Sequence, residues 1–277
     1  MPLSGQIEFR DPIREAPMSC YRVVDENGDI VDGAEDPELG EELMIQLYTN
    51  MVQLNVRETP HSMDRVLYDA QRQGRMSFYL TAFGEEAVQF GTASALAPQD
   101  LVFGQYREPG VLMWRGYALQ QFVDQCFSNI DGHTLGRQTP MHYGSRRLNY
   151  LTLASPLATQ VPHAAGAAYG FKLAKEDRIA VAFFGDGASS EGDAHAGLNF
   201  AATKDCPVLF ICRNNGYAIS TPTHEQFRSD GIASRGKAYG IPSMRVDGND
   251  VVAVHVATQR ARAFIREHGR PVLLETM

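Results

Sequence analysis

Residues 178–193 read "RIAVAFFGDGASSEGD", an apolar run that ends directly in a Gly-Asp-Gly turn. Apolar runs of the same kind follow at 207–214, 243–248 and 271–277. They alternate with helical patterns at 188–204 and 250–268. The runs are apolar on both faces, which is typical of strands that helices cover on each side. The pattern therefore predicts an α/β fold with a doubly wound, mostly parallel sheet.

The region before this sheet shows helical periodicity. In 36–54, Asp36 and Pro37 form a favourable N-cap and first-turn pair for a helix. Further helical patterns begin near Ser62 and cover 84–96, where a short buried strand follows. We expect an N-terminal extended segment, 1–35, followed by an α/β domain with a helical N-terminal region, 36–277. The polar stretch 56–61 is interpreted as an insertion between two helical patterns.

Composition narrows the function classes. The 277 residues are 44% apolar with a formal net charge of −8, and no Lys/Arg-rich stripe is present. We therefore expect neither a nucleic-acid partner nor a basic membrane-binding face. No apolar run approaches the roughly 18 residues of a membrane span, and the first residues lack the pattern of a signal or transit peptide. The four cysteines lack CxxC spacing and are interpreted as buried, reduced thiols rather than metal or redox groups.

Polar residues stand at the ends of two expected strands. Asp186 follows the first, and "RNNGY", 213–217, follows the second. Parallel sheets bind ligands beyond these carboxyl ends, and the next helix, with Ser190 and Asp193 at capping-box spacing, offers free N–H groups to an anion. A diphosphate there would need a divalent cation, and Mg²⁺ suits hard oxygen ligands. Either motif alone is more typical of an ordinary turn.

The two motifs together are more specific. Residues 188–213 separate Gly187 from Asn214, a spacing that resembles the thiamine diphosphate signature of GDG followed by NN about two dozen residues later. The longer segments "FGQYREPGVLM", "YLTLASPLATQVPHAAGAAYG" and "CPVLFICRNNGYAISTPT" resemble the decarboxylase alpha subunit of mitochondrial-type branched-chain 2-oxoacid dehydrogenase complexes. The resemblance runs from about residue 20 to the end. "SSEGDAHAG" distinguishes the chain from pyruvate dehydrogenase alpha subunits.

The resemblance implies a thiamine diphosphate-binding fold and three sets of ligands. The Mg²⁺ set is Asp186, Asn215 and the main-chain carbonyl of Tyr217. The cofactor set is Gln105, Tyr106, Arg107, Ser155, Leu157, Gly185, Gly187, Ala188 and Arg213. The K⁺ set is Ala154, Pro156, Thr159 and Gln160. Ala154 stands where close animal relatives have serine, so that position offers a backbone carbonyl and no hydroxyl.

The implied activity is that of 3-methyl-2-oxobutanoate dehydrogenase (2-methylpropanoyl-transferring), an oxidoreductase of branched-chain amino acid catabolism. The enzyme decarboxylates branched-chain 2-oxoacids and passes the acyl group to a lipoyl group on the acyltransferase core. In this family a beta subunit supplies the glutamate that activates the cofactor. The resemblance therefore implies an α₂β₂ heterotetramer in the mitochondrial matrix.

No catalytic residue is assigned within the chain. The family's catalytic histidine lies beyond Met277, so the chain is expected to be a fragment. His133, His142, His163 and His195 are interpreted as structural or supporting histidines, and Glu85 and Glu86 as solvated or capping residues. Two alternatives remain open at this point: a pyruvate dehydrogenase alpha subunit and a non-catalytic cofactor-binding subunit.

Overall fold

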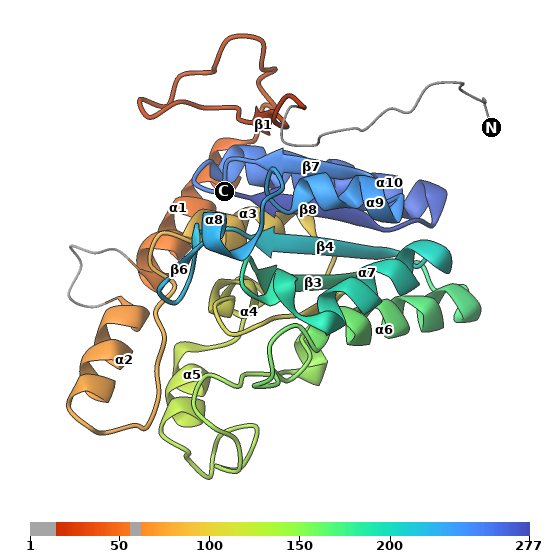
Figure 1. Cartoon of the computed structure of the whole chain (residues 1–277). Helices are drawn as coiled ribbons and strands as arrows, with labels where there is room; N and C mark the ends of the chain where they lie inside the picture. Colours follow the sequence, from red (N-terminus) through yellow and green to blue (C-terminus); the bar gives the residue numbers. More distant parts are fainter. Residues whose placement is uncertain (1–14, 56–61) are drawn as a thin grey trace, which may run out of the picture.

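A six-stranded parallel sheet forms the centre of the molecule (Figure 1). The computed structural model describes residues 15–55 and 62–277. The strand order is β1-β7-β8-β4-β3-β2, and every neighbouring pair is parallel. The strands are β1 (Cys20–Tyr21), β2 (Leu101–Phe103), β3 (Ala180–Gly185), β4 (Val208–Arg213), β7 (Ser243–Val246) and β8 (Val272–Thr276). The predicted α/β fold is confirmed.

Helices cover both faces of this sheet. Along β3, Val181 and Phe183 pack into one apolar core, and Ala182 and Phe184 pack into a second core on the opposite face. The first core lies under α3 (Glu86–Ala95) and α10 (Val251–His268). The second lies under α6 (Gln160–Ala174) and α7 (Gly192–Thr203), which run side by side along one face (Figure 1). Burial on both sides explains the uninterrupted apolar strands.

The remaining elements are short or lie outside the sheet. Within the described residues, the other helices of six or more residues are α1 (Glu41–Leu54), α2 (Met63–Arg72), α4 (Pro109–Trp114) and α5 (Leu119–Cys126). One-turn helices are α8 (Thr223–Gln226) and α9 (Gly236–Tyr239), with 3₁₀ turns at Arg146–Leu148, Ala188–Ser190 and Ala233–Arg235. A small antiparallel hairpin joins β5 (Tyr217–Ala218) to β6 (Thr221–Pro222).

Two expected helix starts are wrong. The first helix begins at Glu41 rather than after Asp36, because Glu38 has a left-handed φ of 51° that a helix cannot continue through. The Asp36 carboxylate instead accepts a hydrogen bond from the Glu38 N–H at 2.8 Å. The capping box at Ser190 is also absent, because Ser190 belongs to a 3₁₀ turn and the N-cap of α7 is Glu191, which makes no side-chain cap.

The N-terminal segment contributes to the sheet. Cys20 and Tyr21 form edge strand β1, paired with Arg245 and Val246 of β7. The division at residue 35 stays a prediction, and the expected insertion at 56–61 lies outside the described residues.

All four cysteines are free. Three are buried as expected, but Cys20 is exposed because it lies on the edge strand. No helix in the described part of the chain is long and apolar enough to cross a membrane.

Candidate functional site

The pairing of β3 with β4 brings the two polar motifs to one edge of the sheet. Gly185 is in register with Arg213, so Asp186 and Asn214 each lie one residue beyond paired positions. Asp186 is only 2% exposed, and its Oδ2 accepts a hydrogen bond from Gln226 Nε2 at 2.9 Å. An almost buried carboxylate at a strand end, outside both apolar cores, is typical of a ligand-binding edge.

Gly187 of the first motif lies against Ala218, the residue that follows the second motif. A Cβ atom placed on Gly187 would lie 2.7 Å from the Cβ of Ala218 in the small hairpin. The Gly187 φ of −62° is ordinary, so the position needs glycine for space rather than for backbone freedom. The absence of a side chain therefore lets the hairpin that carries Tyr217 lie directly on the loop that follows Asp186.

Gly187→Ala should push this hairpin away from Asp186. The added methyl group meets another methyl group that is fixed to the backbone, so we expect a loss of about 1–3 kcal/mol of folding free energy. Binding of Mg²⁺ with pyrophosphate should weaken in parallel. Gly192→Ala is the matched control, because no atom lies within 4 Å of the place that its Cβ would take. Equal stability and affinity of the two variants would contradict the close approach.

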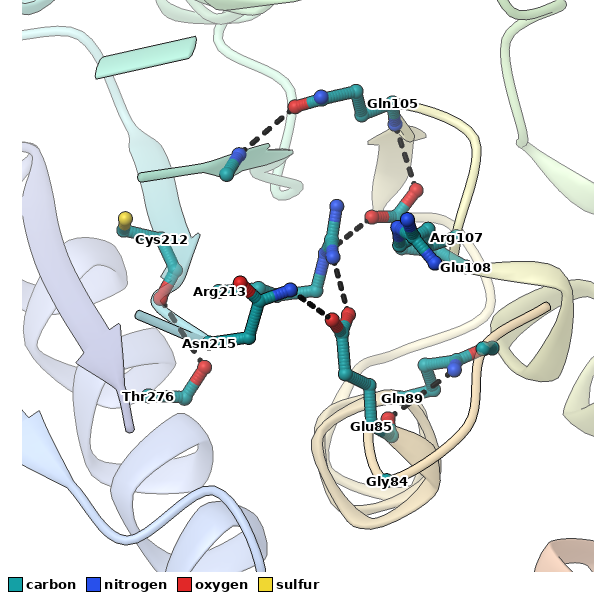
Figure 2. A network of polar contacts seen from close by, with 12 residues as sticks. Gly84, Glu85, Gln89, Gln105, Arg107, Glu108, Cys212, Arg213, Asn215 and Thr276 are labelled. Atoms are coloured by element: carbon teal, nitrogen blue, oxygen red, sulfur yellow. Dashed lines mark hydrogen bonds and ion pairs between the residues drawn. The ribbon is translucent and has the colours of Figure 1, made fainter. Parts of the chain in front are cut away.

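A buried ion-pair cluster surrounds Arg213 at the end of β4 (Figure 2). The Arg213 guanidinium contacts the carboxylate of Glu85 and forms an ion pair with Oε1 of Glu108 at 2.5 Å. Glu108 Oε2 accepts the Gln105 N–H at 2.7 Å. Asn215 Nδ2 donates to Glu85 Oε1 at 2.9 Å. One arginine thus joins the end of β4 to the start of α3 and to the loop after β2.

The two charges of the Glu85–Arg213 pair stabilise each other. Burial alone would raise the pKa of Glu85, but the Arg213 guanidinium and the Asn215 amide together hold this pKa below its ordinary value. Burial alone would lower the pKa of Arg213, but the carboxylates of Glu108 and Glu85 raise it. Glu85 and Arg213 are therefore a charged pair.

The interpretation of Glu85 as a solvated or capping residue is wrong. Glu85 precedes α3 without capping it through its side chain, and the residue is 8% exposed. The prediction that Glu85 and Glu86 point to different faces is correct. The carboxylate of Glu86 accepts a hydrogen bond from Asn55 Nδ2 at 2.9 Å, whereas that of Glu85 contacts Arg213. No pattern near residue 85 indicates a partner as distant as Arg213, so the sequence carried no signal for this contact.

Gln105 connects the cluster to β3 and α6. Its Oε1 accepts the Gly185 N–H at 2.8 Å and lies 3.5 Å from Gln160 Nε2. Gln160 also donates to the carbonyl of Phe183 at 2.8 Å. Two residues that the sequence placed in separate ligand sets therefore contact each other at the end of β3.

The loop before α6 carries most of the predicted K⁺ ligands. Ala154, Ser155, Pro156 and Leu157 are exposed. Thr159 Oγ1 donates to the Pro156 carbonyl at 3.1 Å. Two of the predicted oxygen ligands therefore already lie side by side.

His142 contacts Ser155 of this loop. His142 Nε2 lies 2.7 Å from Ser155 Oγ, and Nδ1 lies 2.8 Å from Thr139 Oγ1 and 2.9 Å from the Pro140 carbonyl. This arrangement agrees with a supporting histidine. The sequence did not indicate Ser155 as its partner.

A cavity of about 490 Å³ opens at the carboxyl ends of β4 and β8. Its lining includes Glu85, Arg107, Arg213, Asn215 and Thr276. The Arg107 guanidinium contacts the carbonyl of Thr81 and lies 5.6 Å from the centre of the Tyr106 ring. Among the described residues, Arg107 forms no ion pair with a carboxylate, so its charge is available to an anion. Ser155 and Leu157 are not part of this lining.

The buried carboxyl group of Asp64 forms hydrogen bonds with the segment that precedes Glu85. The carboxylate of Asp64 accepts from the Tyr79 hydroxyl and from the Ala82 N–H, both at 2.6 Å. Burial raises the pKa of Asp64 to about 6, although these two hydrogen bonds act in the opposite direction. The folded state therefore keeps a proton that the unfolded chain releases at lower pH.

The stability that Asp64 contributes should fall as pH rises through about 6. Relative to Asp64→Asn, which carries no such proton, the wild-type free energy of unfolding should decrease by about 2 kcal/mol between about pH 4.5 and 7.5. Urea unfolding at several pH values measures this difference. Asp69→Asn, on the half-exposed side of the same helix, should follow the wild-type profile. A difference between Asp64→Asn and wild type that does not change with pH would contradict the raised pKa.

A family model matches residues 56–277 of the chain. It describes the dehydrogenase E1 component. The chain belongs to this family. The matched residues include both strand-end motifs, the ion-pair cluster and the loop before α6.

Curated relatives share the sequence closely. The chain is 56% identical over 261 residues to "2-oxoisovalerate dehydrogenase subunit alpha, mitochondrial" of Caenorhabditis elegans, covering 94% of the chain and 59% of the relative. It is 54% identical over 272 residues to the Homo sapiens protein of the same name, covering 98% of the chain and 60% of the relative. The chain thus spans about three fifths of the length of these relatives.

A solved structure supports the fold. The chain is similar to transketolase from Campylobacter jejuni, with a TM-score of 0.61 and 17% sequence identity, over 86% of this chain and 38% of that one. At this identity the similarity concerns the fold, and it agrees with the thiamine diphosphate-binding fold that the sequence predicts.

Proposed function

We propose that the chain is the cofactor-binding part of the alpha subunit of a thiamine diphosphate-dependent branched-chain 2-oxoacid dehydrogenase. The observation that carries the proposal is that the two signature motifs follow neighbouring strands, and Gly187 of the first lies against Ala218, the residue after the second. Family membership and the names of the curated relatives support the same activity.

The oxygen atoms of the two motifs fit Mg²⁺. Asp186 offers a carboxylate oxygen, Asn215 an amide oxygen and Tyr217 a main-chain carbonyl, which are the hard ligands that Mg²⁺ prefers. Asn215 Oδ1 also accepts the Tyr217 N–H at 3.1 Å, which keeps these two ligands on one turn. We infer that these three residues hold the metal against a diphosphate.

The charges of the site explain why a metal would be needed. Arg213 forms ion pairs with Glu85 and Glu108. Asp186 adds a third carboxylate at the end of β3, and Arg107 is the second guanidinium, so these residues carry no excess of positive charge. A diphosphate brought into these surroundings would meet net negative charge unless a divalent cation accompanied it. Arg107 is the cation with the most available charge for the phosphate oxygens.

The other predicted ligands have supporting roles. Gln105, Gly185 and Ala188 bring backbone and amide groups to the end of β3, and Tyr106 packs beside Arg107. Ser155 and Leu157 are proposed to line the thiamine part. We propose K⁺ between the carbonyls of Ala154 and Pro156, Thr159 Oγ1 and the Gln160 side chain, because the hydroxyl of Thr159 and the carbonyl of Pro156 already lie 3.1 Å apart.

When bound, thiamine diphosphate supplies the electron sink for the loss of CO₂ from a 2-oxoacid. The residues of this chain bind and orient its diphosphate end. The remainder of the activity is proposed to need a beta subunit in an α₂β₂ heterotetramer and a lipoyl-bearing acyltransferase core. We propose the mitochondrial matrix as the location, because the names of the relatives place those proteins in mitochondria.

Calorimetric titration of thiamine diphosphate and Mg²⁺ into the chain, with and without the beta subunit, tests the cofactor site. We expect binding that requires Mg²⁺ and tightens with the partner. Absence of metal-dependent binding in both cases would refute the proposal.

Decarboxylation by a reconstituted complex tests the substrate. We expect 3-methyl-2-oxobutanoate to be preferred over pyruvate, in agreement with the relatives named 2-oxoisovalerate dehydrogenase. A preference for pyruvate would indicate a pyruvate dehydrogenase alpha subunit. Cofactor binding without any turnover would indicate a non-catalytic binding subunit.

A further inference from the structure

Glu85 connects a buried cation to one of the proposed metal ligands. Its Oε2 contacts the Arg213 guanidinium, and its Oε1 accepts a hydrogen bond from Asn215 Nδ2 at 2.9 Å. Figure 2 shows the carboxylate in contact with both side chains, at the start of α3. Both oxygen atoms of Glu85 are therefore occupied, and each has a different partner.

The backbone of Glu85 is also held in place. Gln89 Nε2 donates to the Glu85 carbonyl at 3.2 Å, and Gln89 Oε1 accepts the Gly110 N–H at 2.8 Å. Arg213 is held in turn by Glu108, which is fully buried. The Glu85 carboxylate thus has a fixed position relative to the end of β4.

This contact is one of two that fix which end of the Asn215 amide faces the site. A carboxylate can only accept hydrogen bonds, so it selects the NH₂ end of the amide. The opposite end, Oδ1, accepts the Tyr217 N–H at 3.1 Å and keeps a second lone pair. Without Glu85, the Tyr217 N–H alone would hold the amide, which would turn over more readily and present its NH₂ group; this group cannot bind a cation.

We propose that Glu85 is a positioning residue that presents the Asn215 oxygen to the divalent cation. The inference rests on the Mg²⁺ site proposed above. Glu85 itself does not contact the metal. It acts through the amide, in the way that carboxylates behind metal ligands hold those ligands in their binding orientation.

Two other carboxylates provide matched controls. Glu108 shares Arg213 with Glu85, but it has no contact with Asn215 among the described residues. Glu86 is adjacent in sequence, and its carboxylate contacts Asn55 and the Gly84 N–H instead. Glu86→Gln controls for the loss of a charge near α3, and Glu108→Gln controls for the disturbance of Arg213.

The first experiment measures Mg²⁺ affinity by calorimetry in the presence of thiamine diphosphate, with each variant assembled with the beta subunit. Glu85→Gln should weaken Mg²⁺ binding about 10- to 100-fold. Glu86→Gln should bind like wild type, and Glu108→Gln should lose less affinity than Glu85→Gln. An equal loss in Glu85→Gln and Glu108→Gln would show that the effect passes through Arg213, and would overturn the inference.

The second experiment exchanges donor and acceptor. In the double variant Glu85→Gln/Asn215→Asp, the new amide at position 85 can donate an N–H to the new carboxylate at position 215. Because both ends of that carboxylate are oxygen atoms, one of them still faces the metal. The double variant should therefore recover most of the affinity that Glu85→Gln loses. The exchange also keeps the total charge of the pair. A double variant as weak as Glu85→Gln alone would overturn the inference.

The outcomes separate this inference from the proposed function. If wild type binds Mg²⁺ with the cofactor and Glu85→Gln binds equally well, only the role of Glu85 is refuted. If wild type shows no metal-dependent binding, the proposed site is refuted and the inference fails with it. Thermal unfolding of each variant identifies any loss of affinity that comes from misfolding.

Discussion

Asp186→Ala is expected to abolish Mg²⁺-dependent binding of thiamine diphosphate while the fold stays intact. The substitution removes a charged metal ligand at the end of β3, and we expect the Mg²⁺ affinity to fall by more than about 100-fold. The side chain belongs to neither apolar core, and its described side-chain partner is Gln226. The melting temperature should therefore change little.

Asp186→Asn distinguishes the effect of the lost negative charge from the effect of a changed side-chain shape. Its amide oxygen can still accept from Gln226, so packing is preserved while the negative charge is lost. Calorimetry with Mg²⁺ and thiamine diphosphate should show a large loss of affinity in both variants. Asp193→Ala, in the exposed first turn of α7, is the control and should bind normally. Unchanged affinity in Asp186→Ala would refute the metal-ligand assignment.

Arg213→Met should cause the largest loss of stability among these variants. The substitution keeps much of the side-chain volume but leaves the carboxylates of Glu85 and Glu108 buried without their cation. Breaking a buried ion pair by removing one partner typically costs about 3–5 kcal/mol. Urea unfolding near neutral pH measures this loss, and added salt should not reduce it much, because the pair is shielded from solvent.

Arg266→Met is the matched control for Arg213→Met. Arg266 forms an ion pair with Asp177 at 2.5 Å, but both side chains are exposed. Its removal should leave the melting temperature close to that of wild type, because exposed ion pairs contribute little. Similar unfolding curves for the two variants would show that the Arg213 cluster is not a buried charge network.

Much of the sheet could be predicted because its signal is local. The apolar runs correspond to β3, β4, β7 and β8, and the helical pattern near Ser62 corresponds to α2. The starting residue of α1 could not be predicted, because Asp36 and Pro37 satisfy the usual rules and the left-handed Glu38 interrupts the helix after them. Strand β1 was also missed, since two residues carry no periodic pattern.

For the candidate site, the motifs indicated the edge of the sheet but not its neighbours. The sequence predicted that Gly187 and Asn214 both follow strand ends, and the structure shows that these strands, β3 and β4, are neighbours. The individual ligand roles stay predictions. The sequence did not indicate that Ala218 lies against Gly187, or that Ser155 is the partner of His142. Each of these contacts depends on the conformation of a loop.

The sequence by itself determined the parallel α/β fold and the residues that carry the cofactor signature. Both depend on short-range order: the burial of consecutive apolar residues in a strand, and polar residues directly after it. Only the tertiary structure decided which charges share the site. Glu85 and Arg213 are 128 positions apart, and their contact exists because the fold brings the start of α3 to the end of β4. Buried charges of opposite sign must pair because an unpaired buried charge is strongly destabilising. No local sequence pattern shows which distant residue will be the partner.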